Sequence, residues 1–239
     1  MVKLHEVEVD ARSPDHLDQL IGPTRAARFD TQAQAARELL GGRAVININS
    51  TATGGGVAEL LQTLLAYARG VGVDARWLVI EGHPAFFEIT KRIHNHLYGT
   101  RGDGGPLATG ERQVYEETLR ANADDLLALV RPGDVVVLHD PQTAGLAATV
   151  RRAGGVVVWR CHVGVDTPTA EVQQAWEFLH PYLDDVDGYV FSRRAFAPAW
   201  VDDDRLHVIA PSIDPFSAKN YEMPPGEAVR LLRYVGLLA

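Results

Sequence analysis

One stretch, Val45 to Leu65, constrains the fold more than any other part of the chain; it reads VININSTATGGGVAELLQTLL. A run rich in apolar, β-branched residues ends at Asn49 and Ser50. Three glycines follow, and apolar residues then recur at the i, i+3, i+4 spacing of a half-buried helix. This order of strand, glycine turn and helix opens nucleotide-binding α/β sheets, so it predicts a ligand site at the turn.

The three glycines, Gly54, Gly55 and Gly56, have a physical reason to be there. Glycine permits positive φ and lets the backbone approach a ligand closely, and a helix N-terminus presents unpaired N–H groups to a phosphate. The alternative is a tight turn in which glycine serves packing alone. The spacing matches neither G-x-G-x-x-G nor a Walker loop, so the turn favours phosphate or sugar contact without naming the ligand.

The rest of the chain repeats the alternation of strand and helix. We expect an edge strand within 2–9, a short helix starting at Ser13-Pro14 and a helix over 31–40. Further strands are expected at 73–80, 134–138, 156–160, 188–192 and 206–209, and helices at 86–98, 111–130, 141–153, 168–183 and 227–238. Strands rich in Val and Ile that alternate with helices favour the α/β class. The predicted fold is a doubly wound, mostly parallel, Rossmann-like sheet with right-handed crossovers.

Polar clusters follow four of the predicted strands. They are Asn49-Ser50 with the glycines, Glu81 with His83, His139 with Asp140 and Gln142, and Arg160 with His162. In an open parallel sheet all these ends meet at one edge, where ligands bind. A lone histidine is more often structural than catalytic, but the shared edge favours a pocket that holds His139 and His162.

The predicted helix over 86–98 has two faces. Phe86, Ile89, Ile93 and Leu97 form its apolar stripe, and Lys91, His94 and Asn95 share another face. These three polar residues suit sugar hydroxyls or phosphate, although spacing alone fits a solvated polar face equally well.

Composition narrows the function classes. A net charge of −8 argues against general nucleic-acid binding, and no apolar run approaches the roughly 18 residues of a membrane span. No secretory signal is expected. The single cysteine, Cys161, fits a reducing cytoplasm and is interpreted as a core residue rather than a nucleophile. Neither H-E-x-x-H nor G-x-S-x-G occurs, so we expect no metal site, no cofactor and no hydrolase elbow.

Several stretches resemble the N-terminal domain of family-four retaining glycosyltransferases of the B-type fold. Trehalose synthases, which transfer glucose from a nucleotide-glucose onto glucose, and the related trehalose phosphorylases are the most similar members. The resemblance runs from about Val45 to the C-terminus; its stretches are STATGGGVAE (50–59), TKRIHN (90–95), VLHDPQ (137–142), WRCH (159–162) and PSIDPFSAKN (211–220).

The resemblance implies a role for each candidate residue. The glycine loop Gly54–Gly56 would contact donor phosphate or sugar, and His139 would orient the donor sugar at the reacting centre. Acceptor contacts would come from Lys91, His94, Asn95, Asp140, Gln142, Arg160 and His162. The implied partners are a nucleotide-sugar and a small sugar; the donor nucleotide and acceptor stay open.

The resemblance also implies a division of the chain. Residues 1–42 would form an arm and helices, 43–212 the Rossmann-like acceptor-side domain, and 213–239 a linker and the start of a second, nucleotide-sugar domain. The stretch 227–239 would leave apolar residues exposed, where a homodimer could form. Because that second domain carries half of the apparatus for the diphosphate, we expect the chain to be truncated and inactive alone.

Two rival interpretations remain at this point. Glu81, at the end of a strand, could bind a ribose in an NAD(P)-dependent oxidoreductase, although the missing G-x-G-x-x-G weighs against it. A non-catalytic sugar-binding module is the other.

Overall fold

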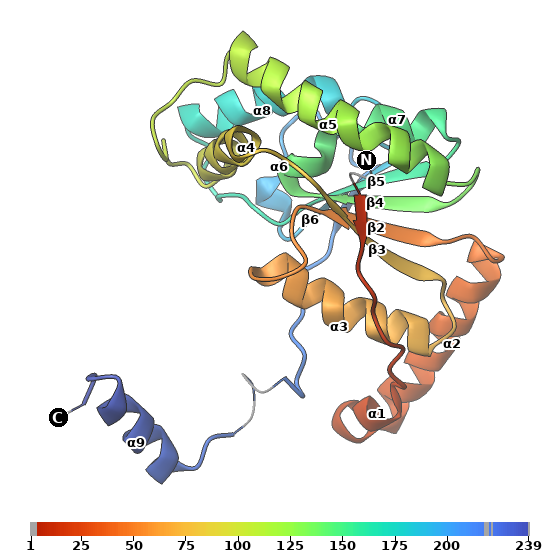
Figure 1. Cartoon of the computed structure of the whole chain (residues 1–239). Helices are drawn as coiled ribbons and strands as arrows, with labels where there is room; N and C mark the ends of the chain where they lie inside the picture. The colour runs from red at the N-terminus through yellow and green to blue at the C-terminus, as the bar shows by residue number, and fades with distance from the viewer. Residues whose placement is uncertain (1–3, 218–219, 221, 239) are drawn as a thin grey trace.

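The protein forms one seven-stranded sheet with helices on both faces (Figure 1). The structure, a computed structural model, describes residues 4–217, 220 and 222–238. The spatial order is β1-β3-β2-β4-β5-β6-β7, and every neighbouring pair is parallel except β1 with β3. The strands are β1 (Leu4–Glu6), β2 (Val45–Asn49), β3 (Ala75–Ile80), β4 (Val135–His139), β5 (Val156–Cys161), β6 (Gly188–Phe191) and β7 (Leu206–Val208). The predicted doubly wound α/β fold is confirmed; residues 2 and 3 of the expected edge strand lie outside the described residues.

The helices divide between the two faces (Figure 1). The first set is α1 (Asp15–Ile21), α2 (Pro23–Leu40) and α3 (Gly56–Gly70); the second is α4 (Pro84–Leu97), α5 (Thr109–Leu129), α6 (Asp140–Thr143), α7 (Ala147–Arg152) and α8 (Ala170–Leu183), with short 3₁₀ turns η1 (Ala144–Leu146) and η2 (Arg194–Phe196). Within the described residues no helix is long and apolar enough to cross a membrane. The cytoplasmic location stays a prediction.

Successive side chains along each strand point to opposite faces of the sheet, so a core forms on each face. In β2, Ile46 and Ile48 are fully buried in the larger core beneath α4–α8. Asn47 and Asn49 point to the opposite face, where Trp77 packs in the smaller core with α3. Cys161 is fully buried in the larger core, as expected, and burial raises the pKa of its thiol well above the usual value.

The helix expected over 141–153 is broken into α6, η1 and α7. The cause is a buried tyrosine from α5. The Tyr115 hydroxyl donates to the Pro141 carbonyl at 2.7 Å and accepts the Gly145 N–H at 3.0 Å, so it occupies the place of a helical i to i+4 bond. A side chain inserted into the ladder in this way bends a helix. The sequence pattern of 141–153 carries no sign of it, because Tyr115 lies far along the chain.

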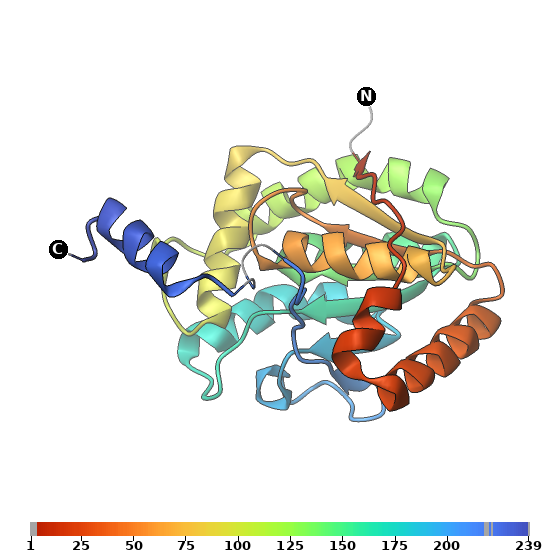
Figure 2. The same cartoon turned by 90° about the horizontal axis from the view of Figure 1, so that it is seen from below.

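Helix α2 begins at Pro23, eight residues before the expected start at Thr31. Gly22 takes φ 79° and ends α1, and Pro23 then occupies the first helical position, which its fixed φ favours. Helix α9 (Pro225–Tyr234) stands away from the sheet in both views (Figures 1 and 2). Residues 218, 219, 221 and 239 of the predicted linker and second-domain segment lie outside the described residues, and the division at 213 stays a prediction.

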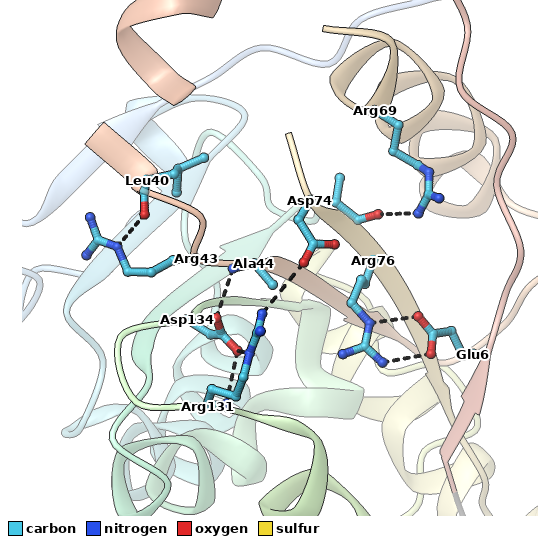
Figure 3. A network of polar contacts seen from close by, with 10 residues as sticks. Glu6, Leu40, Arg43, Ala44, Arg69, Asp74, Arg76, Arg131 and Asp134 are labelled. Carbon is cyan, nitrogen blue, oxygen red and sulfur yellow. Dashed lines mark hydrogen bonds and ion pairs between the residues drawn. The ribbon is translucent and has the colours of Figure 1, made fainter. Parts of the chain in front are cut away.

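Charged side chains pair with one another at the amino edge of the sheet, where β2, β3 and β4 begin (Figure 3). Asp134 accepts the backbone N–H groups of Ala44 at 2.8 Å and Arg131 at 2.9 Å. Arg76 holds Glu6 through two contacts of 2.7 Å. These contacts join strands that are distant in sequence, and they lie at the opposite edge from the predicted ligand site.

Candidate active site at the carboxyl edge of the sheet

Strand register brings the predicted polar residues into one row. His139 of β4 pairs with Arg160 of β5, and Ile48 of β2 pairs with Leu138, so Asn49 and His139 each follow the last residue pair of these two strands. Asn49 itself pairs with Val79 of β3. The convergence expected from parallel topology is therefore found for β2, β4 and β5.

Two of the candidate histidines contact each other. The His139 Nδ1 lies 3.1 Å from the His162 Nε2, and the rings are nearly parallel. The other His139 nitrogen, Nε2, lies 3.0 Å from the Asn47 Oδ1. Because His139 is 1% exposed and His162 only half-buried, the ligand-facing member of the pair is His162. The prediction that His139 orients a donor sugar stays a prediction.

Both rings are uncharged at neutral pH. Burial, reinforced by the positive charge of Arg160, lowers the pKa of His162 to about 4 and that of His139 well below its usual value. The two neutral imidazoles are therefore joined by one hydrogen bond, between the His139 Nδ1 and the His162 Nε2.

Asp140 is held in a strained backbone conformation directly after β4. Its φ of 62° is rare for a residue other than glycine and costs about 1–3 kcal/mol. Two bonds from β5 and the residue after it hold Asp140: the His162 N–H donates to its Oδ1 at 2.8 Å, and the Trp159 indole N–H donates to its carbonyl at 3.1 Å. Burial raises the pKa of the Asp140 carboxyl to about 7, against the opposing effects of that N–H and of Arg160.

Arg160 is half-buried beside this carboxyl. Its guanidinium makes no hydrogen bond or ion pair with any of the residues that the structure describes, and burial lowers its pKa. Arginine carries five N–H donors in a fixed fork that suits phosphate or carboxylate oxygens. Arg160 therefore places a positively charged side chain at the carboxyl edge of the sheet.

The glycine loop follows β2 at the same edge. Gly54 and Gly55 take φ of 74° and 82°, and Gly56 is the first residue of α3. A Cβ at any of the three would meet nothing within 4 Å, so packing against the chain does not require glycine. Positive φ explains the first two, and the bare N-terminus of α3 lies open at Gly56. Asn49 joins this loop to β3, because it donates to the Thr51 carbonyl and accepts the Trp77 indole N–H, both at 2.8 Å.

Lys91 and Gln142 line the same hollow between α4 and α6. The hollow has a volume of about 540 Å³, and its lining residues are Pro84, Phe87, Glu88, Thr90, Lys91 and Gln142. The exposed face of Phe87 supplies an apolar surface there. Its ring is seated at Gly82, where a Cβ would lie 3.2 Å from the Phe87 Cζ. The aromatic ring, cation and amide together suit a sugar.

His94 and Asn95 lie one turn further along α4 and do not line that hollow. His94 packs beside Tyr98, with ring centroids 5.2 Å apart. The Asn95 side chain packs under Gly102, and the backbone carbonyl of Asn95 accepts the Thr100 N–H at 3.0 Å. Asn95 thus supports the loop over 99–107. Ligand contact by either residue stays a prediction.

An arginine of α4 also holds that loop. Arg92 grips Asp103 through contacts of 2.7 and 2.8 Å. Glu81 and His83, the remaining polar cluster, are exposed at the end of β3, where the backbone of Glu81 is bonded to the Asn122 amide.

Sequence reasoning missed Asn47. Asn47 is 4% exposed and lies on the same face of β2 as Asn49. Its signal was the alternation Ile-Asn-Ile-Asn: an amide in a buried strand needs a partner, and that partner had to lie on a neighbouring strand.

A family model matches the part of the chain that contains this site. Residues 47–198 match the family model described as trehalose synthase, N-terminal domain. The chain belongs to this family. The match begins at Asn47 and includes every predicted site residue. Within the described residues, no group of three or more His, Cys, Asp or Glu side chains could hold a metal ion.

Individual relatives agree with the family. The trehalose synthase of Pyrococcus horikoshii is 33% identical over 97% of this chain and 53% of its own length, and that of Rubrobacter xylanophilus is 34% identical over 92% and 54%. A trehalose phosphorylase of Pleurotus pulmonarius is 25% identical over 94% of this chain and 33% of its own. The chain spans about half the length of the trehalose synthases it matches.

Solved structures show the same fold. The trehalose-6-phosphate synthase OtsA matches with a TM-score of 0.58 and 16% identity, over 80% of this chain and 55% of its own. An Escherichia coli trehalose-6-phosphate structure bound with UDP-2-fluoro glucose gives the same score and identity, over 80% and 54%. The domain has the architecture of one half of a glycosyltransferase B fold, as predicted.

Proposed function

We propose that this chain is the acceptor-side half of a retaining glycosyltransferase that moves glucose from a nucleotide-glucose onto glucose to form trehalose. The observation that carries the proposal is the meeting of the glycine loop, Asp140, Arg160 and His162 at one edge of the sheet, in a chain of the trehalose synthase family. The UDP-2-fluoro glucose bound by a structural neighbour supports a nucleotide-sugar as the donor class.

The donor's diphosphate lies against Gly55, Gly56 and the N-terminus of α3 in this proposal. Unpaired N–H groups and the positive end of the helix dipole stabilise phosphate oxygens there. Arg160 contributes a fixed charge toward the same edge. Departure of a nucleoside diphosphate creates negative charge, and donors already in position lower the barrier to that step.

The acceptor glucose lies between the hollow and the histidine pair. Phe87 offers an apolar ring face to the sugar, and Lys91 and Gln142 bond its hydroxyls. Asp140 and His162 lie toward the donor, with His139 acting behind His162. A carboxyl with a pKa of about 7 can accept a hydroxyl hydrogen bond in either protonation state.

The reaction as proposed needs neither a metal nor a cofactor, and the partners are a nucleotide-sugar and a small sugar. Residues 213–239 form the linker and the start of a second domain that reads the nucleotide. Because that domain supplies the rest of the charge stabilisation, the 239-residue chain binds sugar but does not turn over. Formation of disaccharide by this chain from nucleotide-glucose and glucose would contradict the division of labour.

Fluorescence titration tests the binding half of the proposal. Trp159 lies behind Asp140, so a sugar at this edge should change tryptophan emission. We expect a saturable change with glucose or trehalose and none with NAD. Saturable NAD binding without a response to sugar would favour the oxidoreductase and overturn the proposal. Lys91→Ala should weaken glucose binding about tenfold, the loss of one charged hydrogen bond. Arg92→Ala, at the next position of α4, removes a cation that is bonded to Asp103 and does not line the hollow, and it provides the matched control.

A further inference from the structure

We infer that Asn47 is a positioning residue that fixes which nitrogen of His162 faces the ligand. The inference rests on the proposed function for its catalytic meaning, but the arrangement it describes can be measured without any ligand.

The first step is the contact between Asn47 and His139. The Asn47 Oδ1 lies 3.0 Å from the His139 Nε2, and both side chains are more than nine-tenths buried. An amide oxygen can only accept, so the hydrogen of the neutral His139 ring lies on Nε2. The His139 Nδ1 then carries a lone pair.

The position of the hydrogen on the His139 ring determines its position on the His162 ring. The His139 Nδ1 can only accept, and the atom 3.1 Å away is the His162 Nε2, which must therefore carry that ring's hydrogen. A neutral His162 is left with a lone pair on Nδ1. The half-buried ring thus presents an acceptor, which suits a sugar hydroxyl. The Asn47 amide, two hydrogen bonds away, therefore determines which His162 nitrogen carries the lone pair that faces the ligand.

The amide suits the role because it is neutral. An aspartate at the same place would stabilise an imidazolium and charge the pair, and the charge would lie near Arg160. With asparagine the pair stays neutral, consistent with burial and Arg160 lowering both histidine pKa values. Asp140 is the other titratable group facing the pair, through its bond to the His162 N–H.

A purely structural role is the competing explanation, because any buried amide needs a hydrogen-bond partner. Such a role predicts lost stability on substitution but no particular tautomer. The tautomer is therefore the decisive measurement.

Long-range ¹H–¹⁵N NMR of the histidine-labelled chain at pH 7 reads it directly. We expect His139 and His162 both to carry the hydrogen on Nε2, with no change down to about pH 5. If either ring carries it on Nδ1, or exchanges between the two forms, the inference is wrong. The reversed pattern would mean that the Asn47 amide group donates to His139.

Variants separate positioning from packing. Asn47→Leu should leave His139 as a mixture of tautomers, whereas Asn49→Leu, on the same strand and face but bonded to Trp77, should leave both tautomers unchanged. Asn47→Asp, which keeps the shape, should raise the pKa of the pair by about 1–3 units. An unchanged tautomer in Asn47→Leu or an unchanged titration in Asn47→Asp would overturn the inference.

Glucose titration of the unaltered chain keeps the two proposals distinguishable. If glucose binds but the tautomers are reversed, the positioning role fails and the proposed function stands. If the tautomers are as expected but no sugar binds, the proposed function fails.

Discussion

The two edges of the sheet contain the same residue types, aspartate and arginine, but in different bonding arrangements. At the amino edge, Asp134 is buried and accepts hydrogen bonds from Ala44 and Arg131; burial acts to raise its pKa, but those bonds outweigh it and lower the pKa. At the carboxyl edge, burial prevails and raises the pKa of Asp140 to about 7. Arg131 is paired, whereas Arg160 makes no ion pair among the described residues. One edge joins strands, and the other keeps a carboxyl and a cation available for a ligand.

Removing the amino-edge carboxylate tests the structural half of this comparison, and its effect should be the largest. Asp134→Ala leaves two backbone N–H groups without their acceptor and should lower the free energy of unfolding by about 3–4 kcal/mol. Urea denaturation measures it. Because the folded pKa is lowered, this contribution is present above about pH 4 and is lost as the pH falls through the folded pKa. A loss under about 1 kcal/mol would remove the distinction between the edges.

Asp140→Asn should have the opposite sign and a somewhat smaller effect. The folded pKa of Asp140 is raised, so the wild type is most stable below about pH 4 and loses stability as the pH rises toward 7. The shift corresponds to about 4 kcal/mol, and we halve it because the side chain is partly exposed to solvent. Asparagine tolerates positive φ, so the backbone conformation should be retained. The free energy of unfolding of Asp140→Asn should exceed that of the wild type by about 2 kcal/mol at pH 7 and by almost nothing at pH 4. Equal stabilities at pH 7 would show that the carboxylate is better solvated than its position suggests.

Arg160 at the carboxyl edge and Arg76 at the amino edge allow a matched comparison. Arg160→Gln should weaken binding of a nucleoside diphosphate about tenfold, or about 1.4 kcal/mol, with little loss of stability. Arg76→Gln, which breaks the pair with Glu6, should leave binding unchanged and cost less than about 1 kcal/mol of stability. Calorimetric titration with UDP and denaturation of both variants give the four values. Equal binding by the two variants would count against a ligand role for Arg160.

The smallest effect on stability is expected in the glycine turn, at Gly56. In Gly55→Ala the new Cβ would meet nothing within 4 Å, so the loss of stability comes only from the backbone; its φ of 82° and ψ of 156° are essentially confined to glycine, and such strain costs about 1–3 kcal/mol. Gly56→Ala, where φ is not positive, should be neutral for stability but should weaken UDP binding if phosphate approaches the backbone there. If Gly56→Ala binds UDP as well as the wild type does, the glycine turn serves the packing or conformation of the chain and does not contact phosphate.

Much of the site was predictable because it depends on topology. The Val-rich runs, the glycine turn and the alternation of strand and helix specify a parallel sheet, and such a sheet necessarily places the residues after β2, β4 and β5 at one edge. The apolar stripe of α4 was equally readable, since its residues recur three or four positions apart and all are buried: Phe86, Ile89, Ile93 and Leu97.

Contacts between side chains from different elements were not predictable. Local pattern could not show that Tyr115 would enter the helix after β4 or that Asn47 would bond His139. Nor could it show that Asn95 would support a loop while Lys91 lines the same hollow as Gln142. Periodicity and chain connectivity are local properties, and they predicted the strands, their direction and the edge at which the candidate residues lie. Which histidine faces outward and which carboxyl has a raised pKa could be known only from the packing. Burial and hydrogen-bond partners set those properties, and they come from residues dozens of positions away.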